Sequence, residues 1–583
     1  MTATGTKTGE GDSYPRPSSS DIHPASCLAH TVGLQADIAD IDKGLAWHYD
    51  QIALLKARRN ALTPIRRLPN ELMIRIFAIV AVESDTLFNL RWTKLMYVCH
   101  HWHGLALAAQ PLWGFIDLQW HGLGRLFGQL RHSGAAPLSF KMICHEHSSR
   151  LCLDVILEQS VRIRDFELCG EAREVYKLIG RLTEYKFPIL SSFSLHSGSG
   201  RDQLQDDALK DLPEAILRLP SLRELRLTLL GFPWTSLSSL TTLALHQCHD
   251  SSTTLPQSFH GLLDMLSSCP RLQSLKLEVT IPPPLPNQVY VTVDLPALAK
   301  LYLRDALASC EILLNHLRIP SRATMEILPY TVQTGAHIRG VLVPIRRHLR
   351  AIGARTPLML KISRPDVGYC TITVYYYTVP RTPFDYDPDC PLILNSHPET
   401  EISVRQILTK VFKALPSASI THLNGRDGSG VRPVTWRAVI LLLPALHTIY
   451  LGLGTGAADC IGALRDIETL DPQHQKFPRV RCLHIRFGRR RDRNTNPIVV
   501  VLDALEGFTQ MCFANGNSLQ VLKFDDEFYN LSEQEHILER LFPMVGEIRW
   551  NKEVYDPVRR KEQLPQREAE RRALMAELGI EGY

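Results

Sequence analysis

Three glycines in the stretch "IYLGLGTGAADCIGALRDIE" have the residue type and position to hold phosphates. Gly452, Gly454 and Gly456 come after an apolar strand pattern and before a helical one, as in loops that bind dinucleotides. Their spacing is G-x-G-x-G, however, and the strand before them also fits a repeat that recurs along the chain. A turn between a repeat strand and its helix needs glycine anyway, so we do not expect a nucleotide site.

Metal-ligating side chains gather at two places, "HHWH" (His100 to His103) and "CHEH" (Cys144 to His147). A closed tetrahedral zinc site needs a second pair of ligands at a suitable spacing, and neither stretch has one. The acidic stretch "DYDPDC", which begins at Asp385, lacks the spacing of a calcium loop. No Ser-His-Asp or Cys-His arrangement stands out. The sequence therefore predicts no metal, no cofactor and no enzyme activity of its own.

A dense basic run, "RFGRRRDR" (Arg486 to Arg493), follows a predicted strand. Arginine clusters can contact nucleic acid or phosphorylated peptides, and the alternative is a solvated loop. The net charge of +5 over 65.9 kDa is too dilute to predict a polyanionic partner. We favour the solvated loop and do not expect nucleic acid as a partner.

The composition indicates a soluble protein of a reducing compartment. The 583 residues exceed what one hydrophobic core usually organises, so several domains or a repeat array are expected. The 13 cysteines are scattered and form no C-x-x-C pair, which favours free thiols over disulfides. The longest apolar run, Ala438 to Leu446, is far shorter than the roughly 20 residues that a membrane span needs. We expect a cytoplasmic or nuclear protein, or both, with no membrane partner.

The elements that would position any site fall into successive zones. Residues 1–30 are rich in Gly, Ser, Thr and Pro, which predicts a disordered tail. Residues 31–62 predict an amphipathic helix, with alternating steps of four and three between its seam residues. This helix either self-associates as a short coiled coil or lies on the next domain. Two polar seam residues and Gly44 weaken the coiled coil, and we favour the second alternative. The seam residues are Leu34, Ile38, Ile41, Leu45, His48, Ile52, Leu55, Arg59 and Leu62.

Residues 63–118 predict a short helical module with more apolar surface than it can bury. From Pro69 to Val80 the apolar residues wrap most of the circumference of a helix, and Pro69 suits its first turn. A second helical pattern runs from Leu95 to Ala108. The surplus apolar surface indicates a protein partner.

The order of residues in this module resembles an F-box. The matching elements are Leu68-Pro69-x-Glu71-Leu72, then Ile76-Phe77, then Val98-Cys99-x-x-Trp102, then Pro111-Leu112-Trp113. The resemblance implies a three-helix motif that docks on a Skp-type adaptor, which links it to a cullin and RING ubiquitin ligase. By position, it implies that one group faces the adaptor and a second completes the packed motif. The first group is Leu68, Pro69, Leu72, Ile76 and Phe77, and the second is Val98, Cys99 and Trp102. The family usually has basic or small residues where this chain has His100 and His101.

Residues 138–550 predict an α/β repeat. Apolar triplets in the frame L-x-x-L-x-L recur, for example Leu222/Leu225/Leu227 and Leu272/Leu275/Leu277. Seven triplets follow a proline that is itself preceded by Phe, Leu or Cys, and three measured steps between units are 32, 26 and 34 residues. Helix, proline turn and strand at this spacing are typical of an irregular leucine-rich-repeat solenoid. The frame fades between about 305 and 400, and residues 551–583 predict a charged helix or tail. The seven prolines are Pro188, Pro220, Pro270, Pro296, Pro444, Pro478 and Pro543.

Two functions follow from these zones. The combination resembles F-box proteins with degenerate leucine-rich repeats, a basidiomycete-type arrangement found in fungi. It implies a substrate-recognition subunit of a Skp–cullin–F-box ubiquitin ligase, whose solenoid binds an unknown protein substrate. The alternative is a leucine-rich-repeat scaffold without a ligase role, in which the apolar helix packs on its own solenoid. Whether Leu72, Ile76 and Phe77 are exposed in the isolated chain distinguishes the two.

Overall fold

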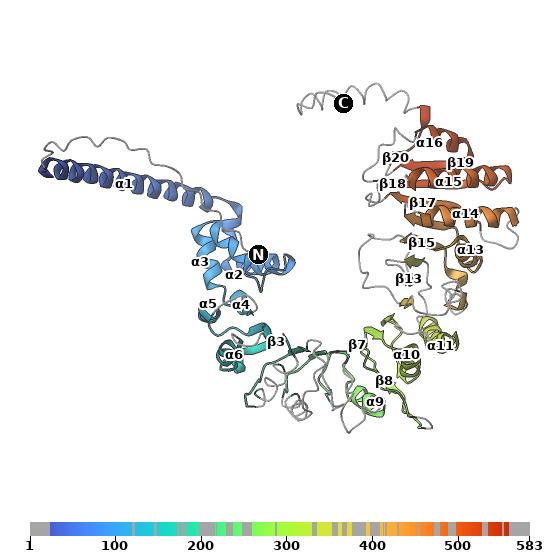
Figure 1. Ribbon diagram of the computed structural model, residues 1–583, viewed down its shortest axis with the longest axis horizontal. Helices are drawn as coiled ribbons and strands as arrows, with labels where there is room; N and C mark the ends of the chain where they lie inside the picture. The colour runs from blue at the N-terminus through green and yellow to red at the C-terminus, as the bar shows by residue number, and fades with distance from the viewer. Residues whose placement is uncertain are drawn as a thin grey trace, which may run out of the picture. The chain divides into compact units, whose positions relative to one another are not determined.

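The computed structural model (Figure 1) describes most of the chain from residue 24 to residue 558. The predicted tail before residue 24, most of "CHEH", all of "DYDPDC", the arginines after 487 and the predicted C-terminal helix lie outside the described residues. The described residues are 24–118, 123–144, 149–171, 175, 181, 184–197, 216, 219–228, 237–247, 259–285, 288–328, 335–351, 359–363, 370–375, 392–396, 409–411, 413, 417–427, 431–452, 455–470, 479–487, 497–526, 535–550 and 553–558.

The chain divides into two compact units. Unit 1 comprises residues 1–113 with 129–134, and unit 2 comprises residues 114–128 with 135–583. The boundary lies at Trp113, so the predicted module 63–118 ends slightly too late. The three-residue strand β1 (Phe115–Asp117) already belongs to the sheet of unit 2, because it pairs with β2 (Leu138–Cys144).

Unit 1 is helical. The predicted motif of three helices is not confirmed as such, because the middle one of the three elements around its core is a 3-10 helix and a further helix of four residues follows them. The elements are α1 (Pro24–Ala61), η1 (Pro64–Arg67), α2 (Asn70–Glu83), η2 (Arg91–Tyr97), α3 (His100–Ala108) and α4 (Gln110–Trp113). Elements α2, η2 and α3 surround a small apolar core. Its buried members are Met73, Phe77, Ala81, Trp92, Leu105, Ala106, Ala109, Leu112 and Trp113.

Helix α1 is longer than predicted and does not lie on the rest of unit 1 along its apolar seam. Its seam residues between Ile38 and Leu55 are exposed. Only the C-terminal part of α1, from Ala53 on, lines a groove together with η2 and α3. The expectation that this helix covers the next domain is therefore wrong for the seam.

Unit 2 is built on one largely parallel sheet of 18 described strands, called the repeat sheet below. Between β2 and β19, the strands are β3 (Ile163–Gly170), β4 (Ser192–Ser197), β5 (Glu224–Thr228), β6 (Thr242–His246), β7 (Ser274–Glu278), β9 (Lys300–Arg304), β11 (Thr324–Ile327), β12 (Met359–Ser363), β13 (Cys370–Tyr375), β14 (Leu392–Ser396), β15 (His422–Asp427), β16 (Thr448–Gly452), β17 (Cys482–Phe487), β18 (Leu519–Asp526) and β19 (Val545–Trp550). The sheet ends at β20 (Glu553–Val554), and β8 (Val293–Asp294) pairs separately with β10 (Leu317–Arg318).

The predicted triplets form the buried side of these strands. In β5, Leu225 and Leu227 are buried, and they stand in register with Leu243 and Leu245 of the parallel strand β6. The alternate residues of each strand point to the opposite face and are more exposed. This confirms the alternating pattern on which the repeat prediction rests.

The repeat is interrupted where its sequence frame fades. Strand β11 pairs in parallel with β9 on one side and with β14 on the other. The chain then returns through two antiparallel pairings, β14 with β13 and β13 with β12, and β12 pairs in parallel with β15. The strands β12 to β14, which follow helix α11 (Gly335–Ala351), thus continue the sheet as an antiparallel insert.

Helices cover one face of the repeat sheet. Consecutive helices α13 to α16 pack on one another, and Figure 1 shows them stacked beside the strands that they connect. The helices of unit 2, with α5 spanning the boundary, are α5 (Leu123–Ser133), α6 (Ser149–Leu157), α9 (Phe259–Ser267), α10 (Leu307–Asn315), α11 (Gly335–Ala351), α13 (Pro433–Leu441), α14 (Thr455–Leu470), α15 (Pro497–Ala514) and α16 (Glu535–Leu541), with short 3-10 turns η3 (Ser160–Arg162), η4 (Ser417–Ser419) and η6 (Phe542–Met544).

Candidate functional site

Helix α2 has an apolar inner face and an apolar outer face. At 3.6 residues per turn, Met73, Phe77 and Ala81 share the inner face and are buried. Leu72 and Ile79 lie on the opposite side and expose 46% and 47% of their surface. The outer face of α2 is defined here as Leu72, Ile76, Ile79, Val80 and Val82.

The predicted adaptor-facing residues divide between these two faces. Leu72 and Pro69 are exposed, whereas Leu68 and Ile76 are half-buried and also touch the core of unit 1. Phe77 is fully buried, and its ring centroid lies 5.1 Å from the ring centroid of Trp102. The phenyl group therefore holds α2 against α3 and is not presented at the surface.

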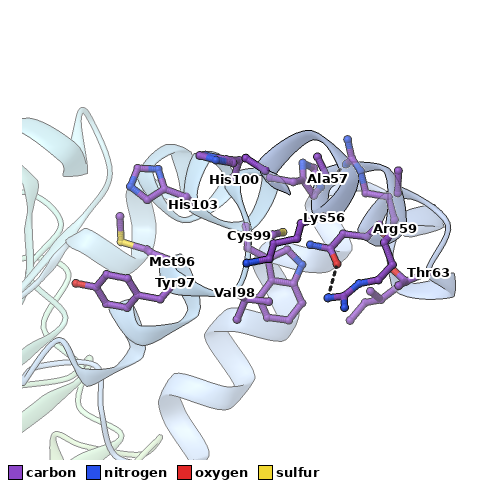
Figure 2. Close-up of a pocket in the computed structure, with 17 residues that line it drawn as sticks. Lys56, Ala57, Arg59, Thr63, Met96, Tyr97, Val98, Cys99, His100 and His103 are labelled. Carbon is purple, nitrogen blue, oxygen red and sulfur yellow. Dashed lines mark hydrogen bonds between the residues drawn. The ribbon is translucent and has the colours of Figure 1, made fainter. Parts of the chain in front are cut away.

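The second predicted group lies together at the start of α3. Val98 is exposed, and Cys99 and Trp102 are half-buried. All three line an open groove of about 850 Å³ between the C-terminal part of α1 and the η2–α3 segment. Figure 2 shows Val98 and Cys99 facing Lys56 and Arg59 of α1 across this groove.

The groove combines apolar surface with basic groups. Tyr97 exposes 87% of its surface and Val98 exposes 56%. Lys56, Arg59 and Arg66 also line the groove, and no acidic residue does. Such a lining favours a partner with an apolar segment and acidic side chains.

His101 also lines the groove, next to Arg66, but its imidazole is neutral there. The guanidinium of Arg66 donates to its Nε2 at 2.5 Å, which requires a neutral imidazole. Desolvation and the Arg66 charge both lower the pKa of His101. Both histidines line the open groove, His100 exposed and His101 half-buried.

Sequence reasoning missed several residues of these surfaces. Ile79 and Val82 continue the face of Leu72 at helical spacing, so the periodicity of α2 could have identified them. Tyr97 and the α1 side of the groove carried no such signal. They are brought together by the turn at η1, which depends on packing rather than on a local pattern.

The open face of the repeat sheet offers a second surface. Near its middle, Glu278 is buried among three basic groups, with 2.6 Å to Lys276 Nζ, 3.6 Å to Arg304 Nη1 and 3.8 Å to His246 Nε2. Lys276 also lies over the ring of Tyr302, 4.8 Å from its centroid. Burial, and next the nearby Glu278 carboxylate, raises the pKa of Tyr302 to about 12.

A comparable group lies on the later strands. Tyr450 and His484 stand in register on β16 and β17, with ring centroids 4.6 Å apart. Arg426 lies 5.5 Å from the Tyr450 ring centroid and 3.6 Å from a carboxylate oxygen of Asp525. Lys523 lies 2.8 Å from the same carboxylate. This face presents aromatic rings and mostly basic groups held in fixed positions.

In the stretch that resembles a nucleotide-binding loop, the packing of the backbone requires the first glycine, Gly452. A Cβ atom at Gly452 would lie 2.1 Å from the carbonyl oxygen of Arg426 on the adjacent strand. Gly452 ends β16 and α14 begins at Thr455, so the stretch serves a strand-to-helix connection of the repeat sheet.

Among the residues that the structure describes, no three His, Cys, Asp or Glu side chains lie close enough together to hold a metal ion. In the same described part of the chain, no helix has the length and apolar character to cross a membrane.

No protein-family model matches the chain. No curated protein matches it either. Among solved structures, the leucine-rich repeat-containing protein LegL7 from Legionella pneumophila is similar over 65% of this chain and 89% of its own, with 13% identity and a TM-score of 0.25. A chain of the Rad7 and Elc1 complex in yeast is similar over 82% of this chain and 97% of its own, with 10% identity and a TM-score of 0.27. Likeness at this level carries no argument about function, which rests on the two surfaces described above.

Proposed function

We propose that unit 1 docks on a Skp-type adaptor and that the protein is the substrate-recognition subunit of a Skp–cullin–F-box ubiquitin ligase. The observation that carries the proposal is the exposed outer face of α2. A helix of a soluble protein normally keeps its outer side polar, whereas this one presents Leu72, Ile79 and Val82. An apolar surface of this kind supports a protein partner that buries it.

The groove beside Val98 supports the same partner. It is basic as well as apolar, so an adaptor segment with acidic and apolar side chains would fit it. In this proposal Leu68, Pro69, Leu72 and Ile76 contact the adaptor, and Val98, Cys99 and Trp102 form the groove wall. Phe77 acts indirectly by fixing the position of α2.

The open face of the repeat sheet would then bind the protein substrate. Its part in the reaction is proximity, since it would hold a substrate lysine near the catalytic partner of the ligase and raise its effective concentration. The chain itself supplies no catalytic group in this proposal and acts in the cytoplasm, the nucleus or both.

The test is binding of the purified full chain to a Skp-type adaptor, measured by calorimetry. Leu72→Asp places a carboxylate in the centre of the proposed contact and should weaken binding at least about a hundredfold. Val434→Asp is the matched control, because Val434 is an exposed apolar residue in the first turn of α13 in unit 2. It should bind as the wild type does.

The alternative is a leucine-rich-repeat scaffold without a ligase role. The rest of unit 1 does not cover Leu72, Ile79 and Val82, and in this alternative the chain's own repeats cover them. Absence of adaptor binding by the wild-type chain would favour the scaffold. Equal loss of binding in both variants would show that the contact is not on α2.

A further inference from the structure

Helix α1 carries a second unpartnered apolar surface, separate from the outer face of α2. It spans 38 residues, or about 57 Å at 1.5 Å per residue. Its seam residues Ile38, Ile41, Leu45, Ile52 and Leu55 expose between 47% and 65% of their surface. No described residue of unit 1 covers this seam.

A helix of this kind needs a partner to be stable in water. Most helical stability in proteins comes from packing of the apolar face, and α1 lacks such packing along its seam. Gly44, in the middle of the helix, costs a further ~1 kcal/mol relative to alanine. The seam residues nevertheless keep heptad spacing, with alternating steps of three and four residues, from Ile38 to Leu55.

The seam has the apolar residues of a coiled coil. Ile38, Leu45 and Ile52 occupy the a positions of successive heptads, and Ile41, His48 and Leu55 occupy the d positions. Five of these six positions are therefore apolar, as in the core of a coiled coil.

Charge then determines the orientation of the two strands. Asp37, Asp40 and Asp42 lie at the N-terminal end of the exposed seam, where Lys43 is the one basic residue among them, and Lys56 and Arg58 lie at its C-terminal end. We propose that α1 forms an antiparallel two-stranded coiled coil with a second copy of this chain. In that arrangement the acidic part of each helix faces the basic part of the other.

A parallel pair would place like charges together. Arg59, at an a position, would face its own copy across the seam, and Asp37 at g would approach Asp42 at e of the other helix. The antiparallel pair that uses the full seam instead sets Ile38 opposite Leu55 of the second copy. It also brings Asp37 and Arg58 together twice, since g positions face each other in antiparallel pairs.

The seam and the groove of unit 1 overlap at one residue. Ala53 and Ala57, which line the groove, lie about 100–140° round the helix from Ile52, whereas Arg59 belongs to both the groove and the seam. Leu54 and Leu55 do not line the groove, so substitutions there test the coiled coil separately from adaptor binding.

The first experiment measures the mass of the full chain by sedimentation equilibrium over a concentration series. Leu54 and Leu55 are adjacent and each expose 65% of their surface, but only Leu55 belongs to the seam. The wild type and Leu54→Asp should approach twice 65.9 kDa, whereas Leu55→Asp should remain at the mass of one chain. Both variants place the same residue in the same turn, so loss of helix alone would affect them equally. A monomeric wild type, or equal masses for both variants, would overturn the proposal.

The second experiment determines the orientation. Chains carrying Ile38→Cys and Leu55→Cys are mixed, oxidised and digested, and the linked peptides are identified by mass spectrometry. The antiparallel pair predicts links between position 38 of one chain and position 55 of the other. Links of position 38 to itself and of position 55 to itself would show a parallel pair and overturn the assignment.

Discussion

The assignment of inner and outer faces to α2 can be tested by two substitutions five residues apart. Phe77→Ala removes a fully buried ring that packs on Trp102. Such substitutions cost about 3–5 kcal/mol, through lost transfer free energy and the cavity left behind. Leu72→Ala removes a side chain that is already 46% exposed, so about half of the ~1.5–3 kcal/mol for full burial is lost. The better helix propensity of alanine should reduce that loss slightly.

Hydrogen exchange followed by mass spectrometry measures how much each substitution destabilises α2, separately from unit 2. At 1.4 kcal/mol per factor of ten, Phe77→Ala should speed exchange of the α2 amides at least about a hundredfold, or to the rate of an unfolded chain. Leu72→Ala should speed it less than about tenfold. Amides of β16 in unit 2 serve as the internal control and should not change.

An equal effect of the two substitutions would refute the reasoning. It would mean that Leu72 is buried as deeply as Phe77 in solution, so that the outer face of α2 is not available. The adaptor proposal would then lose the observation that carries it. The reverse order of effects would mean that α2 is rotated, with Leu72 facing the core of unit 1.

Two further predictions concern unit 2. Glu278→Gln keeps the shape of the side chain but removes the charge shared by its three basic neighbours, and should cost about 1–3 kcal/mol, measured as a lower midpoint of thermal unfolding. An unchanged midpoint would show that the cluster adds nothing to stability. His422 and His484 have their pKa values lowered to about 4, by burial first and then by His447 and Lys523 respectively. Between pH 6.5 and about 4 the unfolded chain therefore binds more protons than the folded chain, and stability falls as the pH is lowered through this range. In urea unfolding, His484→Gln should show a smaller loss from pH 7 to pH 5 than the wild type, and an identical loss would contradict the assignment.

The sequence predicted the repeat strands because their signal is local. Alternating leucines after a proline turn determine both the strand and its buried side, as Leu225 and Leu227 show. Strand β1 was missed because three residues are too few for such a pattern. Phe77 was assigned by its position in a motif, although its step of four from Met73 already placed it on the buried side of α2.

The insert between β11 and β15 could not be predicted in the same way. Residues 359–363, 370–375 and 392–396 each have strand character, but their order in the sheet is the reverse of their order in the chain. Pairing is decided by partners far apart in sequence, such as Met325 beside Leu392 and Met359 beside His422. Reversing the order lets β14 continue the ladder of β11, while β12 presents an edge for β15. The parallel strands from β15 on therefore continue the same sheet. The exposed residues of the strands before and after the insert lie on this one hydrogen-bonded sheet. The open face of the repeat sheet therefore continues across the insert, although no repeat frame in the sequence connects its two halves.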